Sequence, residues 1–132
     1  MTEAQLHTLL KKNIEGHWCR VENTIGAGMP DVNVVHNGIE IWIELKIIKG
    51  NYLLFEWSQI NWFNCRQLNG MENIYVVARN ADKIMIIKAA DIKKEMVKKK
   101  ASKAGVRIDD DLIHQNFYKP WDWDEILTSL FY

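Results

Sequence analysis

Asp31, Glu44 and Lys46 are the residues of this chain best suited to chemistry, because a single sharp turn would bring them together. Asn37-Gly38 is the strongest two-residue signal for a β-hairpin, since a type I′ turn requires positive φ at both central positions. With these two residues as the loop, the antiparallel ladder runs back until Asp31 lies opposite Glu44. Lys46 follows two residues later on the same face of its strand.

The two faces of this hairpin differ in character, because side chains alternate across a strand. One face is expected to be core, and it carries Val32, Val34, Ile39, Ile41, Ile43 and Leu45, with His36 beside the turn. The other face is expected to be too polar for a core, and it carries Asp31, Asn33, Glu40, Trp42, Glu44 and Lys46.

Two opposed carboxylates favour a cation between them. Directly opposed residues have Cβ atoms about 4.5–5.5 Å apart, and like charges there destabilise the pair by up to about 1 kcal/mol. Repulsion raises one pKa unless a cation compensates. Mg²⁺ prefers one or two carboxylates together with waters and phosphate oxygens. Lys46 could then place its charge beside an attacking water or a scissile phosphate. A solvated outer face joined by cross-strand salt bridges explains the same pattern.

The motif Gly28-Met29-Pro30-Asp31, followed after a strand by Glu44-Leu45-Lys46, resembles the PD-(D/E)xK signature of restriction-type nucleases. Ser58-Gln59 resembles the glutamine motif of the virus-type replication-repair (VRR-Nuc) branch, and Arg20-Val21-Glu22-Asn23 resembles small phage-encoded members. The resemblance covers about residues 18 to 80. It implies a restriction-endonuclease-like fold, an α/β domain whose mixed central β-sheet is flanked by α-helices.

The resemblance also implies a Mg²⁺-dependent DNA endonuclease that tolerates Mn²⁺ and leaves a 5′-phosphate and a 3′-hydroxyl. Asp31, Glu44 and the backbone carbonyl of Leu45 would hold the ion, and Lys46 would orient or deprotonate the water. Stand-alone relatives are often dimers that cut branched DNA such as four-way junctions. A homodimer acting on such DNA in replication, recombination or repair is therefore expected.

Further residues are candidates for the outer part of this site. The amide of Gln59 could hold a water or a DNA phosphate, or the residue could simply be polar at a helix N-terminus. Glu22 could supply an outer acid, or it could be an exposed, ion-paired strand residue. Glu3, on the first predicted helix, is the alternative outer acid, although a surface pair with His7 explains it as well.

Charge is distributed unevenly along a chain whose net charge is zero. Residues 93 to 107 hold seven basic side chains and one acid, whereas residues 109 to 125 hold six acids and one lysine. A basic segment can neutralise phosphates even on a neutral protein, although a lysine run is equally compatible with a solvated helix face. The residues expected to contact DNA are Arg66, Lys98, Lys99 and Lys103.

Hydrophobic periodicity and turn signals predict the elements that position these residues. Helices are expected over 2–15, 58–68, 91–103 and from about 122 to 131; strands over 18–22, the hairpin, 74–78 and 84–88. The glycine-containing segment 24–29 is expected to be a loop at the hairpin entrance, either a place of close phosphate approach or a plain connection. Segment 52–57 is expected to be a loop over the site, and 106–118 strand-like or irregular.

The whole chain of 132 residues reads as one soluble globular domain, with 48% hydrophobic and 26% charged residues. A catalytic core is expected over about 18–88, followed by a basic helix and an acidic, aromatic tail over 89–132. We expect no signal peptide and no membrane span. Cys19 and Cys65 are expected to be buried thiols in a reducing compartment, which indicates the cytoplasm, that of the host if the protein is phage-encoded.

Two other classes of function fit the same residues. The chain could be a non-catalytic DNA-binding or assembly module that retained the nuclease fold. It could also be an enzyme of another kind, such as a metal phosphodiesterase acting on small nucleotides. The sequence shows no second carboxylate–histidine cluster, which argues against the usual two-metal hydrolases.

Overall fold

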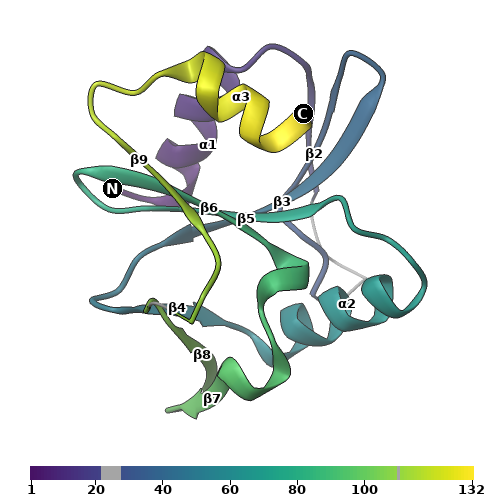
Figure 1. Cartoon of the computed structure of the whole chain (residues 1–132), viewed down its shortest axis with the longest axis vertical. Helices are drawn as coiled ribbons and strands as arrows, with labels where there is room; N and C mark the ends of the chain where they lie inside the picture. Colours follow the sequence, from purple (N-terminus) through teal and green to yellow (C-terminus); the bar gives the residue numbers. More distant parts are fainter. Residues whose placement is uncertain (22–27, 110) are drawn as a thin grey trace.

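A mixed β-sheet forms the centre of the structure, a computed structural model that describes residues 1–21, 28–109 and 111–132 (Figure 1). In this part of the chain the sheet has six strands, in the order β1-β2-β3-β5-β6-β9. Every neighbouring pair is antiparallel except β3 and β5, which are parallel. The strands are β1 (His17–Arg20), β2 (Val32–His36), β3 (Ile39–Ile47), β5 (Ile74–Arg79), β6 (Lys83–Lys88) and β9 (Gln115–Tyr118).

The β2–β3 hairpin has the predicted register. Asn37 and Gly38 form its turn with φ values of 53° and 79°, the positive values that a type I′ turn requires. Val32 pairs with Ile43, the last pair of the ladder. Asp31, the next residue back, therefore comes opposite Glu44, and the register prediction is confirmed.

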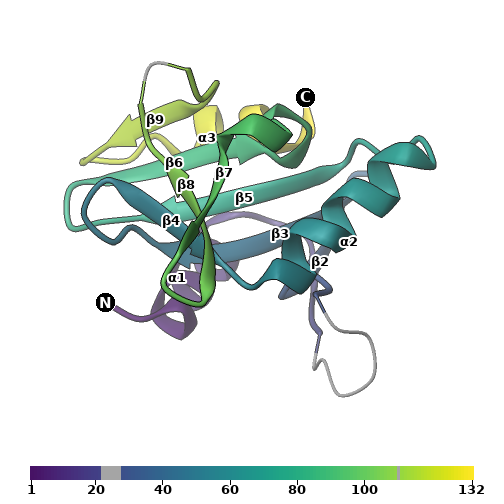
Figure 2. The ribbon, with the colours of Figure 1, turned by 90° about the horizontal axis from the view of Figure 1, so that it is seen from below.

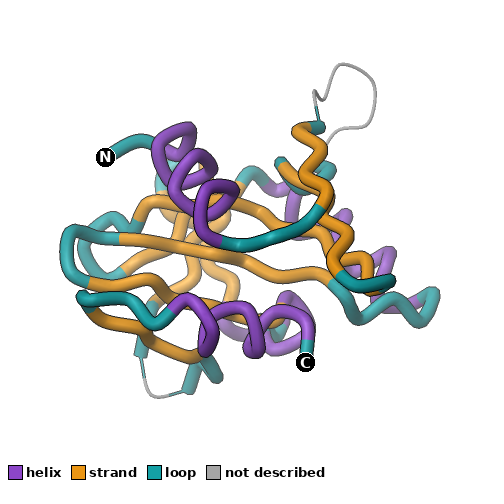
Figure 3. Tube along the Cα trace, turned by 90° about the horizontal axis from the view of Figure 1, so that it is seen from above, coloured by secondary structure: helices purple, strands orange, loops and turns teal. Residues whose placement is uncertain are grey.

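Two helices cover one face of the sheet, α1 (Glu3–Asn13) and α3 (Trp123–Phe131) (Figure 3). Thr2 begins α1 through a capping box, in which its Oγ1 accepts from the Gln5 backbone N–H and the Gln5 side chain accepts from that of Thr2. The apolar face of the hairpin packs beneath both helices, as predicted. Buried members of this first core include Leu6, Leu10, Ile14, Val34, Ile41, Ile43, Leu45, Ile126 and Leu130.

The opposite face of the sheet is also a core, contrary to the prediction that it would be too polar. It is covered by α2 (Trp57–Leu68) and by a three-stranded sheet of β4 (Tyr52–Phe55), β8 (Lys103–Arg107) and β7 (Val97–Lys100), in the order β4-β8-β7 (Figure 2). The neighbouring strands supply apolar side chains that the hairpin alone does not show: Val76, Ala78, Met85 and Ile87. The polar residues of the hairpin are thereby enclosed at one side of this second core.

The predicted helix over 91–103 is wrong. The chain forms two short 3₁₀ turns, η1 (Ala89–Asp91) and η2 (Lys94–Met96), and then the β7–β8 hairpin. Ala101 has a φ of 54° in the turn of this hairpin. Ile92 and Met96 are spaced as in a helix, but β4 offers an edge with which β8 pairs over residues 104–107. Tertiary pairing therefore overrides the local preference for helix.

Two smaller expectations are corrected as well. Segment 52–57 is mostly strand β4 and not a loop. Segment 106–118, expected to be strand-like or irregular, contains the end of β8 and the edge strand β9, in line with that expectation. Cys19 and Cys65 are both exposed and not buried, because β1 is an edge strand and Cys65 lies on the solvent side of α2. No helix in the described ranges is long and apolar enough to cross a membrane.

Gly28 ties the segment that enters β2 to the start of α2. Its φ is +87°, and an added Cβ would lie 2.0 Å from the Ser58 carbonyl oxygen. Only a residue without a side chain allows this approach of two backbones. Gly28 therefore sets the position of the first helical turn, which carries Gln59.

We expect Gly28→Ala to destabilise the fold by about 3 kcal/mol or more, the sum of left-handed backbone strain and overpacking against Ser58. Gly38→Ala is the matched control, because it shares a positive φ of 79° but has nothing within 4 Å of the added Cβ. Strain alone should cost that variant about 1–2 kcal/mol. Urea unfolding of both proteins measures the difference, and equal losses would show that the contact with α2 is unimportant.

Candidate active site

Asp31 and Glu44 meet at the end of the hairpin where β2 begins. The Asp31 carboxylate oxygen Oδ2 accepts a hydrogen bond from the Leu45 backbone N–H at 2.9 Å, and the Asp31 carbonyl accepts from Val21 at 2.8 Å. These two bonds hold Asp31 against β3 on one side and against the end of β1 on the other. The predicted acid pair is therefore present.

Glu44 is the most unusual side chain of the pair, because it is a carboxylate with only 1% of its surface exposed. Its Oε2 accepts from the Gln59 amide at 2.8 Å and lies 3.5 Å from the Lys46 ammonium nitrogen. Its Oε1 is buried and has no hydrogen-bond partner among the described residues. A buried carboxylate oxygen left in this way requires a proton or a cation.

The electrostatics of the pair also indicate that Glu44 requires a proton or a cation. Burial, and then the charge of Asp31, raise the pKa of Glu44 to about 9, while Lys46 opposes the rise. In the metal-free protein Glu44 thus carries a proton at neutral pH. A divalent cation would take the place of that proton, since ligating carboxylates must be ionised.

Lys46 is enclosed beside this pair, with 12% of its side chain exposed. Its Nζ donates to the Gln59 side-chain oxygen at 3.0 Å and lies 4.8 Å from the centre of the Phe55 ring. Phe55 belongs to β4, the strand that was expected to be a loop. The aromatic face and the amide together hold the ammonium group beside Glu44.

Gln59 joins the two charged residues. Its side-chain oxygen accepts from both Lys46 and the Glu56 backbone N–H (2.9 Å), and its amide nitrogen donates to Glu44. Two donors on the oxygen and one acceptor on the nitrogen fix the orientation of the amide. Gln59 lies in the first turn of α2, which Gly28 positions. The prediction that this residue faces the acid pair is confirmed by these contacts.

The remaining predicted site residues lie apart from the acid pair or outside the described structure. Glu22 falls outside the described residues. Glu3 is exposed on α1, and after the main effect of burial it adds a small increment to the raised pKa of Glu44. Arg66 is exposed on α2 and stacks over Trp62 at 4.5 Å. It lies seven residues beyond Gln59, which is about 10 Å along a helix.

The lysines predicted to contact DNA occupy the β7–β8 hairpin. Lys98 and Lys99 are exposed on β7. Lys103, on β8, forms an ion pair with Glu56, the residue that precedes α2. This pair connects the basic hairpin to the helix that carries Gln59. Sequence reasoning missed both Glu56 and Phe55 as supports of the site, because neither contact is apparent until β4 pairs with β8.

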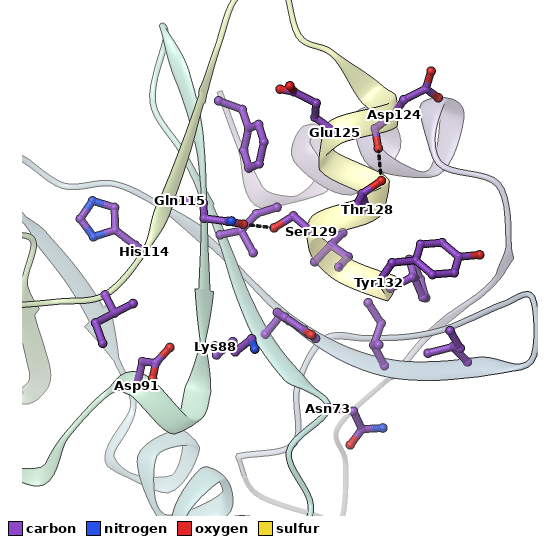
Figure 4. A pocket seen from close by; sticks show the side chains of 18 residues that line it. Asn73, Lys88, Asp91, His114, Gln115, Asp124, Glu125, Thr128, Ser129 and Tyr132 are labelled. Atoms are coloured by element: carbon purple, nitrogen blue, oxygen red, sulfur yellow. Dashed lines mark hydrogen bonds between the residues drawn. The ribbon is translucent and has the colours of Figure 1, made fainter.

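A cavity of about 960 Å³ lies elsewhere, between α3, β9 and the central strands (Figure 4). Its polar lining includes Asp91, His114 and Glu125, and Gln115 accepts a hydrogen bond from Ser129 at its wall. It is on the sheet face opposite the acid pair and shares no residue with it. Across the described ranges, no group of three His, Cys, Asp or Glu side chains converges as a metal site.

The acid pair nevertheless fits a hard divalent cation. Mg²⁺ takes one or two carboxylates and completes its octahedral shell with waters and substrate oxygens. Asp31 and Glu44 supply the carboxylates, and the unpartnered Oε1 of Glu44 supplies a free ligand atom. The residues present therefore suit such an ion.

Comparison with known proteins agrees with the architecture. No protein-family model matches the chain, and no curated protein sequence matches it. Among solved structures it is similar to Hjc, a Holliday junction resolvase from the archaeal hyperthermophile Archaeoglobus fulgidus. The TM-score is 0.52 and the identity is 16%, over 80% of this chain and 84% of that chain. At this identity the likeness shows the fold alone. The chain thus has the expected restriction-endonuclease-like fold, a mixed central sheet flanked by helices.

Proposed function

We propose that this chain is a Mg²⁺-dependent endonuclease that hydrolyses phosphodiester bonds in DNA. The observation that carries the proposal is the buried Glu44, whose Oε1 lacks a partner in the described structure while Asp31, Lys46 and Gln59 surround it. The fold shared with a Holliday junction resolvase supports a branched substrate of the four-way type. Membership of the virus-type replication-repair branch, and a phage origin, remain parts of the proposal that rest on the sequence motifs.

Asp31, Glu44 and the Leu45 carbonyl would hold the ion, with Mn²⁺ as a substitute. When bound, Mg²⁺ supplies a Lewis acid that polarises the phosphoryl oxygen and lowers the pKa of water. Lys46 orients the attacking water through its ammonium group or, as the neutral amine, takes its proton. Gln59 keeps Lys46 and Glu44 at a fixed separation through its two ends. The buried setting strengthens each of these interactions, because competing water is largely excluded.

DNA would lie across the face that bears α2 and the basic hairpin. Lys98 and Lys99 are exposed there and can each neutralise a phosphate, and Lys103 stands beside them on β8. Arg66 offers a bidentate phosphate contact further along α2. We extend the proposal to a homodimer, because symmetrical cutting of a junction requires two sites. The proposed location of this activity is the cytoplasm.

The first test is cleavage by Glu44→Ala and Lys46→Ala. Each should lose at least about 10²- to 10³-fold in Mg²⁺-dependent cleavage, since each removes a group that acts on the reacting phosphate. Glu40→Ala and Lys49→Ala are matched controls, because both residues are exposed, Glu40 on β3 and Lys49 two residues beyond its end. The controls should cut like the wild-type protein. Normal cutting by Glu44→Ala would remove the assignment, and DNA binding without any cleavage would favour the non-catalytic module.

The raised pKa of Glu44 predicts proton release on metal binding. Because that pKa is about 9, the carboxyl group carries its proton at pH 7 and must lose it to bind Mg²⁺. Close to one proton should be released per ion at pH 7, and affinity should rise by about tenfold per pH unit until about pH 9. Calorimetry in buffers of different ionisation enthalpy measures the release. Glu44→Gln should abolish it, and equal heats in all buffers would contradict the prediction.

Substrate structure and oligomeric state form a third test. The wild-type protein should cut a four-way junction faster than linear or nicked DNA of the same sequence, in a titration with Mg²⁺. Light scattering should give twice the mass of one chain. The Glu44→Ala protein serves as the control for contaminating nuclease. Equal rates on all substrates would exclude junction specificity, and a monomeric mass would exclude the homodimer, without affecting the metal site.

A further inference from the structure

A cluster of hydrogen-bond donors lies on the sheet face opposite the acid pair. It consists of Arg79, the last residue of β5, and of Lys119 and Trp121, in the loop that joins β9 to α3 (Figure 1). The Arg79 guanidinium carbon lies 4.3 Å from the centre of the Trp121 ring, and the Lys119 nitrogen lies 5.1 Å from the same centre. We call these three side chains the donor cluster.

Arg79 is a buried cation without a paired anion in the described structure. Only 6% of its surface is exposed, and burial lowers its pKa. Its Nε donates to the Asn80 carbonyl at 3.2 Å, but no carboxylate of the described residues lies within 4.0 Å of its nitrogens. Arginine is rarely buried unless it is paired. Stacking on an aromatic ring compensates only in part and satisfies no N–H group.

The other two members add donors and no acceptor. Lys119 is exposed and brings a second positive charge to the same indole ring. The indole N–H of Trp121 is buried and has no hydrogen-bond partner among the described residues. Guanidinium, ammonium and indole N–H groups can only donate. A ligand that contacts the two cations must therefore be rich in acceptor oxygens and negatively charged.

The acidic side chains nearest in sequence do not fill this role. Asp122 directly follows Trp121, but its Oδ1 accepts from the backbone N–H groups of Asp124 and Glu125 at 3.1 and 3.2 Å and begins α3. Asp82 approaches Lys119 through its backbone carbonyl, which accepts the Lys119 backbone N–H at 3.4 Å. Neither carboxylate forms an ion pair with the cluster.

We propose that the donor cluster binds a phosphate group, and that the DNA backbone supplies it. In the parallel ladder Lys46 pairs with Ala78 and Ile47 pairs with Arg79, so the cluster lies one register position beyond Lys46 at the same end of the sheet. A DNA strand passing round this end would reach the cluster as well as the acid pair. The choice of DNA rests on the proposed function, whereas the phosphate chemistry does not.

The test follows the indole N–H signals of metal-free, ¹⁵N-labelled protein by NMR, where no cleavage can occur. Trp121→Phe identifies one of six tryptophan signals by its loss while keeping an aromatic ring. The Trp121 signal should shift saturably on titration with a duplex oligonucleotide. Inorganic phosphate is titrated separately. A shift with DNA, alone or with both probes, supports the backbone; a shift with inorganic phosphate alone overturns the choice of DNA and assigns free phosphate. No shift with either overturns the site.

Lys119→Gln supplies the quantitative arm, because this exposed residue can change without disturbing the core. It should weaken DNA binding by about tenfold and lower the slope of log affinity against log salt by about one. Lys88→Gln, at an exposed lysine on β6, is the matched control. It should leave both the DNA affinity and the salt slope close to those of the wild-type protein. Equal effects of the two variants would overturn the proposal. Metal is absent from these binding measurements, so they do not depend on nuclease activity. A wild-type protein that binds DNA at the donor cluster but shows no Mg²⁺-dependent cleavage would refute the proposed function and leave this site intact.

Discussion

The burial of one carboxylate is the constraint on which the rest of this structure depends. Glu44 lies in the middle of the sheet with Asp31 beside it, and an isolated charge there would cost several kcal/mol. Lys46 and Gln59 reduce that cost, yet one carboxylate oxygen remains without a partner in the described structure. A fold optimised only for stability would place an apolar side chain at this position. The acid at this position is therefore the feature on which the proposed metal site rests.

Most of the architecture serves to enclose this group. The three-stranded sheet brings Phe55 to the ammonium group of Lys46, and α2 brings Gln59 to both charges. Gly28 lets the hairpin entrance touch the first turn of that helix. The acid pair comes from local hairpin geometry, but its electrostatic character comes from elements that are distant in sequence.

The hairpin could be predicted because its information is local. Asn37-Gly38 determines the turn, the turn determines the register, and the register places Asp31 opposite Glu44. Gln59 could be predicted from the motif resemblance and the helix start. The three main helices also follow from their apolar spacing and caps.

The second core and the basic hairpin could not be predicted in the same way. Burial of Glu44 depends on Val76, Met85 and other residues of strands that pair only in the folded sheet. The lysine-rich segment carries Ile92 and Met96 at helical spacing, so its strand form depends on the edge that β4 presents and not on a local pattern. The donor cluster likewise arises from contact between Arg79 and Trp121, forty-two positions apart in the numbering, which no local pattern reveals.

The pairing of β4 with β8 has a consequence for how the chain could be shortened. A fragment ending after β6 would contain every residue of the acid pair and its lysine, yet β4 would lose its only hydrogen-bonded neighbour in the three-stranded sheet as described. An uncovered strand edge of this kind recruits other chains and promotes aggregation. The C-terminal third is thus expected to protect the preceding two-thirds of the chain from aggregation.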